Sequence, residues 1–222
     1  MRTKQHIAII GATGSMGSAI SKSLCRGNYR LLLCGQDTKK TEKLLAEIRR
    51  DYHNADVTIA PCIKEASWEA EIIILAVSCC TEKEIAERIR KVVNQKIIIS
   101  LANPVHKDLK SMVTDVNSSA TEALQQLLPY AKVIKAFCTT FAADFETPVI
   151  DGNRLDAFIA GNDTEALENV SELISCSGFN PVIVGDLSAS QTLERMQFLL
   201  IQLDLKMIMA EKQAGKSYII NS

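Results

Sequence analysis

The sequence predicts an α/β fold: a doubly wound parallel sheet followed by a small C-terminal α/β appendage that ends in a long helix. Two observations lead to this prediction. Apolar runs alternate with amphipathic helical patterns along the chain, as in consecutive βαβ units. Some of these runs, such as Ile72–Val77 (IIILAV), are apolar at every position. That pattern is typical of parallel strands covered by helices on both faces.

The predicted elements follow one another in a regular order. Strands are expected at His6–Ile10, Tyr29–Cys34, Asp56–Ala60, Ile72–Val77, Lys96–Ser100 and Lys132–Ala136. Between them, helices are expected at Ser15–Arg26, Lys39–Tyr52, Glu82–Val93 and Ser118–Leu128. A turn-rich stretch after Phe145 separates residues 1–145 from the appendage, residues 146–222. In the appendage we expect a strand, a helix, a strand and a final helix at Asp156–Ala160, Thr164–Ser175, Pro181–Val184 and Ser188–Gln213.

One segment near the N-terminus carries most of the functional information. Residues Ile7–Ile20 (IAIIGATGSMGSAI) form an apolar strand that runs into three glycines and then into a helix. Gly11 permits a tight turn, Gly14 lets a pyrophosphate approach the backbone, and Gly17 lets the helix pack closely on the strand. The helix N-terminus adds N–H groups and the positive end of the helix dipole. The alternative is a glycine-rich turn that binds nothing. The context favours a dinucleotide, so residues 1–145 are predicted to be a Rossmann-type NAD(P)-binding domain.

The residues after the second predicted strand bear on the type of dinucleotide. Asp37 stands about 20 residues beyond the last glycine, where an acid commonly holds the ribose hydroxyls of NAD. Lys39 and Lys40 are basic, as the 2′-phosphate of NADP requires. Asp37 is equally well placed to cap the helix that follows. At this level both NADP and NAD stay open.

Ligands of doubly wound sheets bind beyond the carboxyl ends of the strands, so the residues after the later strands are candidates as well. Ala76–Cys80 is a run of small residues that lets a cofactor cross the sheet edge, and its adjacent cysteines are interpreted as packing residues. Asn103 is placed to hydrogen-bond a nicotinamide amide. His106 is either a substrate contact or, more commonly for such a residue, a solvated loop histidine. Lys135–Ala143 offers aromatic, small and hydroxyl side chains that suit a flat ring, with core packing as the alternative.

Composition excludes several classes of function. With 25 basic and 26 acidic residues the net charge is −1, so no overall field attracts nucleic acid or an anionic membrane. The seven cysteines include no CxxC pair and are typical of reduced thiols in a cytoplasmic protein. The polar N-terminus predicts no signal peptide, and the interrupted apolar stretch Met196–Ala210 predicts no membrane span. We expect that stretch to form homodimer contacts instead.

The usual proton-transfer and metal-binding patterns are missing from the sequence. No tyrosine is followed by a lysine four residues later, and no metal-ligand cluster or Ser-His-Asp arrangement is apparent. No metal and no catalytic acid or base is therefore predicted. Hydride transfer between two bound rings fits such a site, because the protein's task is then mainly to orient the rings.

Three longer segments match a known family. They are the opening IGATGSMG, the segment VIKAFCTTFAADF from Val133, and FIAGNDTEALENVSELISCSGFNPVIVGDLSASQTLERMQFLLIQL from Phe158. With these segments the chain resembles, over nearly its whole length, the coenzyme F420-dependent NADP oxidoreductases. That family also includes the cytosolic domain of the six-transmembrane ferric reductases.

The resemblance implies a site for two rings. NADPH would lie along the glycine turn, and a deazaflavin or flavin ring would stack on its nicotinamide as the small-molecule hydride acceptor. The acceptor ring would lie beside Cys138, Thr139, Thr140 and Phe141. The cofactor contacts expected from the residues and the resemblance together are Gly11, Ala12, Thr13, Gly14, Ser15, Met16, Gly17, Gln36, Asp37, Lys39, Lys40, Val77, Ser78, Asn103 and Ala142.

The leading hypothesis is a cytoplasmic NADP(H)-dependent oxidoreductase that transfers hydride between nicotinamide and a deazaflavin- or flavin-type acceptor. Two other functions are compatible with the sequence. One is a reductase of a small imine or carbonyl compound, with Cys138, Thr139 or His106 assisting protonation. The other is a redox sensor that binds NAD(P) without turnover.

Overall fold

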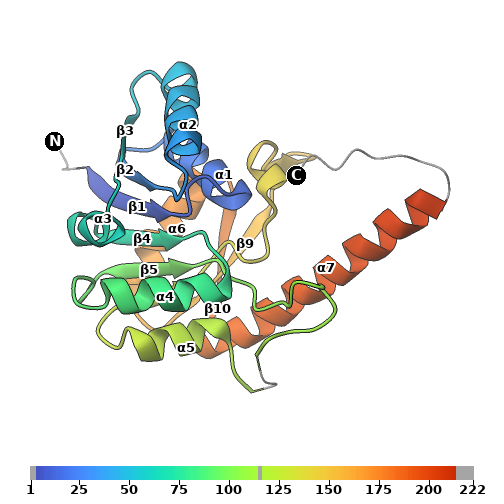
Figure 1. Cartoon of the computed structure of the whole chain (residues 1–222). Coiled ribbons are helices and arrows are strands. Elements are labelled where there is room, and N and C mark those ends of the chain that lie inside the picture. The colour runs from blue at the N-terminus through green and yellow to red at the C-terminus, as the bar shows by residue number, and fades with distance from the viewer. Residues whose placement is uncertain (1–3, 115–116, 214–222) are drawn as a thin grey trace.

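An eight-stranded mixed sheet organises the chain (Figure 1). The computed structural model describes residues 4–114 and 117–213. The strands lie in the order β10-β9-β6-β5-β4-β1-β2-β3. Their bounds are β1 Gln5–Ile10, β2 Tyr29–Cys34, β3 Asp56–Ile59, β4 Ile72–Leu75, β5 Ile97–Ser100, β6 Lys132–Lys135, β9 Asp156–Gly161 and β10 Asn180–Gly185. The α-helices are α1 Ser15–Leu24, α2 Thr38–Asp51, α3 Ile63–Glu69, α4 Cys79–Ile89, α5 Ala120–Leu127, α6 Thr164–Cys176 and α7 Ser190–Gln213.

Helices cover both faces of the sheet, and each face has its own core. Successive residues of a strand point to opposite faces. Ile7 and Ile9 of β1 therefore pack with residues of α1, α2 and α6, whereas Ala8 and Ile10 pack with residues of α3, α4 and α5. Strands β4 and β5 are buried at every position. This confirms the doubly wound arrangement that the apolar runs predicted.

The segment after residue 145 adds its strands to the same sheet. β9 pairs antiparallel with β6, and β10 pairs parallel with β9, so these two strands run opposite to the other six. The chain between β6 and β9 contains only the 3-10 helix η1 (Ala142–Phe145) and the small hairpin β7 (Val149–Ile150) and β8 (Asn153–Arg154). Without a crossover helix the chain returns in the opposite direction. The boundary at residue 145 between two domains stays a prediction.

Three phenylalanines hold the turn after β6 against the rest of the fold. Phe137 follows β6, Phe145 ends η1, and Phe179 precedes β10. The ring centroids of Phe145 and Phe179 are 4.8 Å apart, and those of Phe137 and Phe145 are 5.7 Å apart. Phe137 has a left-handed backbone with φ 56°. The cluster therefore fixes a tight turn at the carboxyl end of β6, where the acceptor ring is predicted.

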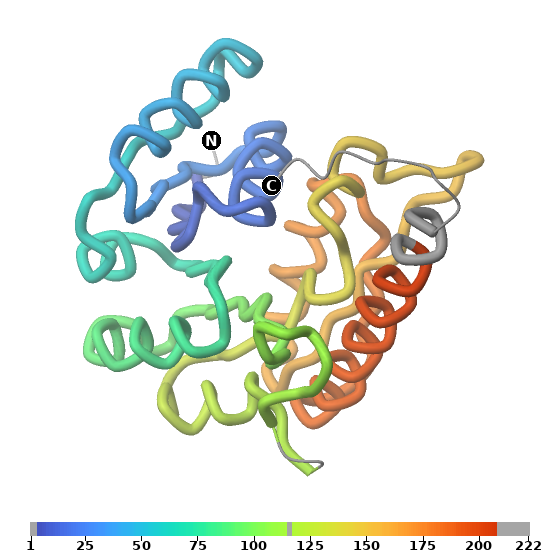
Figure 2. Tube along the Cα trace, turned by 45° about the vertical axis from the view of Figure 1, so that its right-hand side comes forward, coloured from blue at the N-terminus to red at the C-terminus, as the bar shows by residue number. Residues whose placement is uncertain are grey.

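The final helix α7 begins against the sheet and then leaves it, as both views show (Figures 1 and 2). Leu193 in its first turns is buried, whereas Leu199, Leu203 and Met207 are 56%, 46% and 64% exposed. Those three residues recur every four positions and form one apolar stripe on the helix. None of the helices in the described part of the chain has the length and hydropathy that a membrane crossing requires.

Candidate functional site

The glycine turn (Gly11–Gly17) joins β1 to α1 at the carboxyl edge of the sheet. The Gly11 N–H donates to the Cys34 carbonyl of β2 over 2.9 Å. Gly11 has φ 85°, and a Cβ there would collide with the Ala76 carbonyl. A Cβ at Gly17 would overlap the Gly11 carbonyl oxygen. The chain's own backbone and packing therefore require glycine at both positions.

Gly14 has no such internal reason to be glycine. Its backbone (φ −72°, ψ 166°) is open to any residue. A Cβ at Gly14 would meet the Gly11 carbonyl oxygen at 3.4 Å and the Ala76 carbonyl oxygen at 3.9 Å, which are ordinary to slightly tight contacts. Gly14 also lines a cleft. The missing side chain keeps this part of the cleft open for a ligand that approaches the backbone.

Helix α1 begins at this glycine without a side-chain cap. Gly14 is its N-cap, and the first turn holds no acidic residue. The N-caps of α2, α4, α5 and α6 are Asp37, Ser78, Ser119 and Asp163, and each accepts a backbone N–H; the short helix α3, like α1, lacks a side-chain cap. The N-terminal N–H groups of α1 are thus available to an anion, which the helix dipole also favours.

The cleft beside the glycine turn has a volume of about 530 Å³, and we call it the open cleft. It lies where the chain leaves β1 toward β2 on one side and later adds β4 on the other side. This reversal of strand order is where doubly wound sheets bind their ligands. Its lining residues are Ile10, Gly11, Thr13, Gly14, Cys34, Gly35, Gln36, Ala60, Pro61, Ile63, Ala76, Val77, Ser78, Thr81, Glu84, Ile85 and Arg88.

The predicted cofactor residues are distributed over several places. Those that line the open cleft are Gly11, Thr13, Gly14, Gln36, Val77 and Ser78. Ala12 and Gly17 are buried beneath the turn, and Met16 packs against the core. Ser15 and Ala142 line a second cavity of about 380 Å³ between α1 and η1. Asn103 lies elsewhere, at the carboxyl ends of β5 and β6.

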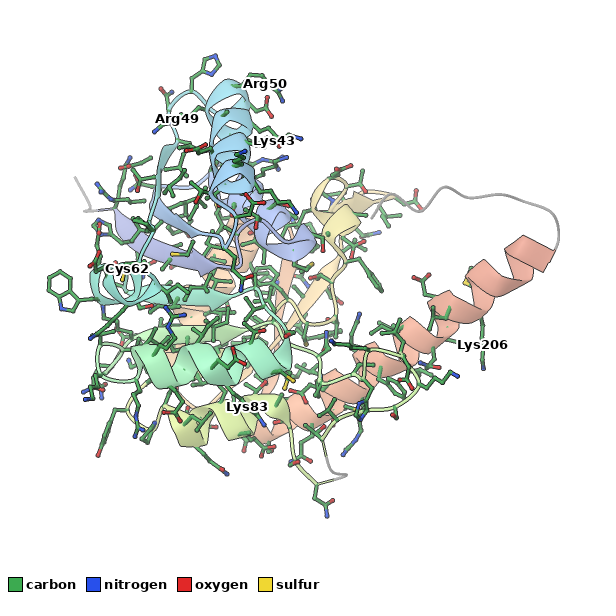
Figure 3. The ribbon with its side chains drawn as sticks, viewed as in Figure 1. Lys43, Arg49, Arg50, Cys62, Lys83 and Lys206 are labelled. Atoms are coloured by element: carbon green, nitrogen blue, oxygen red, sulfur yellow. The ribbon has the colours of Figure 1, made fainter. Side chains whose placement is uncertain are left out.

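Asp37 serves the helix that follows it. Its carboxylate accepts the Lys40 N–H over 3.1 Å and so caps α2. Lys39 and Lys40 are exposed in the first turn of that helix. Further basic side chains, among them Lys43 and Arg50, lie farther along α2 (Figure 3).

Sequence reasoning missed the face of α4 that closes the open cleft. Thr81, Glu84, Ile85 and Arg88 recur at helical spacing and line the cleft together. Arg88 brings a cation to it. The 3.6-residue period of this helix indicates that these four residues share one face, but only the position of the cleft shows that this face lines it. The contributions of Ala60 and Pro61, which follow β3, were missed for the same reason.

Asn103 and Cys138 meet where β5 and β6 end. The Asn103 Nδ2 donates to the Cys138 carbonyl over 2.8 Å. Asn103 Oδ1 and Thr139 Oγ1 are buried without a hydrogen-bond partner among the described residues. Buried polar atoms are normally paired, so these two oxygens lack the partner that such atoms usually have. Cys138 packs with Leu193 of α7 in one apolar cluster, so the start of α7 covers this end of the sheet. We call this region the covered edge; it consists of Asn103, residues 135–139 and residues 193–197.

An ion pair is buried in the covered edge. Lys135 Nζ donates to Glu194 Oε1 over 3.1 Å, and both side chains are 0% exposed. The same ammonium donates to the Ala102 carbonyl, just before Asn103. Glu194 also accepts the N–H groups of Ala120 and Thr121 over 3.0 and 3.3 Å. One ion pair thus ties the ends of β5 and β6 to the starts of α5 and α7.

The side chains predicted beside the acceptor ring differ in availability. Burial raises the pKa of the Cys138 thiol to about 11, so Cys138 is a neutral packing group. Thr140 donates to the Phe137 carbonyl over 2.9 Å and stabilises its own turn. Phe141 is 39% exposed next to η1, and His106 is exposed in its loop.

Within residues 4–114 and 117–213, no three His, Cys, Asp or Glu side chains gather as a metal site.

Comparison with known proteins connects this site to a family. Residues 6–104 match the family model "NADP oxidoreductase coenzyme F420-dependent". The chain is 26% identical to the F420-dependent NADP reductase of Methanocaldococcus jannaschii, over 90% of this chain and 92% of that protein. The resemblance to the coenzyme F420-dependent NADP oxidoreductases is confirmed. The chain is also 26% identical to the metalloreductase STEAP3 of Rattus norvegicus, over 88% of this chain and 37% of that protein.

Solved structures agree with this fold. A putative F420-dependent NADP-reductase from Arthrobacter superposes with a TM-score of 0.76 at 21% identity, over 92% of this chain and 94% of that one. An imine reductase from Streptomyces aurantiacus gives 0.70 at 14% identity, over 95% of this chain and 65% of that one. At such identities the likeness shows the fold alone. Taken with the family match, the prediction of an enzyme of the oxidoreductase class is confirmed.

Proposed function

We propose that the chain binds NADP(H) at the glycine turn and transfers hydride between the nicotinamide and a small-molecule acceptor of deazaflavin or flavin type. Gly14 is the observation that carries this proposal. The chain's own packing does not require glycine there, yet the residue begins an uncapped helix and lines the open cleft. A pyrophosphate that approaches the backbone explains all three properties.

The cleft fits the adenosine end of the cofactor. Gln36, Val77 and Ser78 would contact the adenosine, and the small residues of the glycine turn would leave room for the phosphates. Arg88 lines the cleft, and Lys39 and Lys40 are exposed at the start of α2, so these three cations are the candidates to bind a 2′-phosphate. The Asp37 carboxylate already accepts the Lys40 N–H. These features favour NADP over NAD.

The covered edge fits the nicotinamide end. Asn103 Oδ1 and Thr139 Oγ1 are unpaired acceptors, and the carboxamide of the nicotinamide has N–H donors to offer them. Asn103 keeps its own N–H on the Cys138 carbonyl, so its free oxygen is held in a fixed direction. The acceptor ring would lie beside Cys138–Phe141, and Ala142 would lie near the nicotinamide.

The dinucleotide, when bound, supplies or takes up the hydride. The residues of the chain bind it, fix the orientation of its nicotinamide and keep water away from the reacting face. No side chain has to transfer a proton in this scheme, since the accompanying proton is exchanged with water. A neutral Cys138 and an unpaired Thr139 hydroxyl are sufficient for such a site.

Reduction of an imine or carbonyl compound would instead require a proton donor beside the nicotinamide. The groups available for that role are poorly suited. His106 is exposed in a loop, and the pKa of the buried Cys138 thiol is raised to about 11. We therefore keep the deazaflavin or flavin acceptor as the proposal and use imines as one arm of its test.

The test is stopped-flow mixing of the protein and NADPH with F420, FMN, FAD or a cyclic imine. We expect NADPH absorbance to fall together with the absorbance of a deazaflavin or flavin. A His53→Ala variant, changed at an exposed histidine that does not line the cleft, should react like the wild type. If NADPH were oxidised with the imine but with none of the deazaflavin or flavin compounds, the proposed acceptor class would be contradicted. Tight NADPH binding without any oxidation would contradict hydride transfer and leave a binding protein.

We also propose that the protein is a homodimer in the cytoplasm. The apolar stripe Leu199, Leu203 and Met207 on α7 supports the dimer, because monomers seldom expose such a row. The seven cysteines are free, which fits a reducing compartment. In sedimentation at micromolar concentration we expect a dimer that Leu203→Glu converts to a monomer, whereas Asp204→Asn on the same helix should not. A monomeric wild type would contradict the dimer.

A further inference from the structure

A third ionisable side chain lies close to the buried ion pair. Glu82, in the first turn of α4, is 1% exposed. Its Oε1 has no hydrogen-bond partner among the described residues, and neither has the hydroxyl of neighbouring Ser100. An ionised carboxylate in such surroundings is costly. The Ser100 hydroxyl carries its own proton and faces this carboxyl group, so it favours the ionised form and partly opposes the effect of burial.

The charges that face Glu82 cannot all be neutralised at once. Lys135 faces it from β6 and Glu194 from α7, so one ammonium is shared between two carboxyl groups. Glu194 is the carboxyl group that stays ionised beside Lys135, because it also accepts two N–H groups at the start of α5, where the helix dipole favours an anion. Burial, together with the Glu194 charge, raises the pKa of Glu82 to about 7, against the opposing effects of Lys135, the Ser100 hydroxyl and the Ala102 N–H.

Other ionisable groups on the neighbouring helices are engaged or remote. Glu122 of α5 accepts hydrogen bonds from Ser119 and Gln191. Lys64 and Glu65 of α3 are exposed to solvent. Cys79 lies beside Glu82 on its own helix, and burial raises the pKa of that thiol, which keeps it neutral. The charge balance around Glu82 therefore depends on Lys135 and Glu194.

Glu82 lies behind the loops that we assign to the nicotinamide. It is one helical turn past Ser78, which lines the open cleft. Ser100 and Ala102, its neighbours at the end of β5, immediately precede Asn103. Lys135 likewise precedes the loop that holds Thr139. A change of charge on Glu82 would thus act on the proposed nicotinamide position through buried protein rather than through water.

We infer that Glu82 makes the site discriminate between the oxidised and the reduced nicotinamide. This inference rests on the proposed function. The oxidised ring carries a positive charge and the reduced ring is neutral, while the Lys135–Glu194 pair adds no net charge. An ionised Glu82 attracts the oxidised ring, and a protonated Glu82 does not. Binding of NADP⁺ then releases the Glu82 proton to solvent, whereas binding of NADPH leaves it in place.

The sign of the effect follows directly. As the pH rises through about 7, Glu82 loses its proton, and Kd(NADP⁺)/Kd(NADPH) should fall. If NADP⁺ lowers the pKa of Glu82 by one unit, the ratio changes by roughly tenfold between the two limits. Glu82→Gln keeps the shape but cannot ionise. Its ratio should be independent of pH and equal to the wild-type ratio at low pH.

The experiment is calorimetric titration with NADP⁺ and with NADPH between pH 6 and 8.5, in two buffers of different ionisation enthalpy. The ratio of the two constants removes the titration of the 2′-phosphate, which both forms share. Glu87→Gln, an exposed carboxylate of the same helix, is the matched control. Infrared spectroscopy of the ligand-free wild type adds a separate readout: a protonated-carboxyl band that disappears near pH 7 and that Glu87→Gln retains.

We expect more proton release with NADP⁺ than with NADPH, a ratio that falls with pH in the wild type and in Glu87→Gln, and no trend in Glu82→Gln. Should Glu82→Gln not fold, the wild-type ratio and infrared band still decide. If both forms bind but Kd(NADP⁺)/Kd(NADPH) does not change with pH, this inference is contradicted and the proposed function is not. A missing infrared band at pH 6 would contradict it in the same way. If neither form binds, the proposed function fails together with it.

Discussion

The two halves of the proposed site are built in different ways. The open cleft is formed by short-range features: three glycines, an uncapped helix and the residues that follow β2 and β4. The covered edge is assembled from Asn103, Lys135 and Glu194, which lie far apart in the sequence and meet only in the fold. One half leaves backbone N–H groups for a ligand, whereas the other encloses charged side chains almost completely.

This difference indicates a division of labour. Backbone N–H groups and small residues hold phosphates whatever reaction follows. Buried and cross-linked side chains would hold a ring in one orientation, which the proposed hydride transfer requires. A buried ion pair is often no more stabilising than apolar residues of the same size. The buried Lys135–Glu194 pair therefore fits a role in positioning the loops better than a role in stability.

The largest effect is expected from breaking the ion pair on one side only. Lys135→Met leaves Glu194 buried without its cation and should lower the free energy of unfolding by about 3–5 kcal/mol. The double variant Lys135→Met/Glu194→Leu removes both charges and should recover most of that loss. Denaturant unfolding monitored by circular dichroism measures both. If the single variant were as stable as the wild type, the pair would not be the link between the two loops.

The next effect lies in the glycine turn. Gly17→Ala places a Cβ against the Gly11 carbonyl, and the resulting shift of α1 should lower the free energy of unfolding by about 1–3 kcal/mol. Ala19→Gly on the same helix measures the loss of helix propensity, about 1 kcal/mol, which Gly17→Ala would gain if no clash occurred. Thermal and denaturant unfolding measure the change. Unaltered stability of Gly17→Ala would show that the helix can move away from the strand at little cost.

A smaller effect should separate the two dinucleotides. Arg88→Ala removes a cation from the open cleft and should weaken NADPH binding by roughly tenfold, about 1.4 kcal/mol, with little change for NADH. Arg90→Ala, an exposed cation of the same helix outside the cleft lining, is the control. Calorimetric titration of both cofactors decides. An equal loss of affinity for NADPH and NADH would show that Arg88 contacts a portion of the cofactor that both molecules contain.

Sequence reasoning recovered the fold and the open cleft because both depend on local patterns. Alternating apolar runs gave the parallel strands, and the glycine spacing gave the turn at Gly11 and Gly17. The antiparallel return of β9 was not predicted, because it depends on the absence of a crossover helix between β6 and β9. The covered edge escaped prediction for a related reason. Lys135 and Glu194 resemble ordinary surface residues in the sequence, and only their placement on neighbouring elements buries them.

The most direct test of the account is the NADPH affinity of Gly14→Ala together with its free energy of unfolding. The account predicts that the new methyl group costs the folded protein less than about 1 kcal/mol, because Gly14 has an ordinary backbone and open surroundings. It also predicts a loss of NADPH affinity of more than tenfold, because the methyl group occupies the approach of the pyrophosphate. An unchanged affinity with unchanged stability would contradict the claim that this turn holds a dinucleotide.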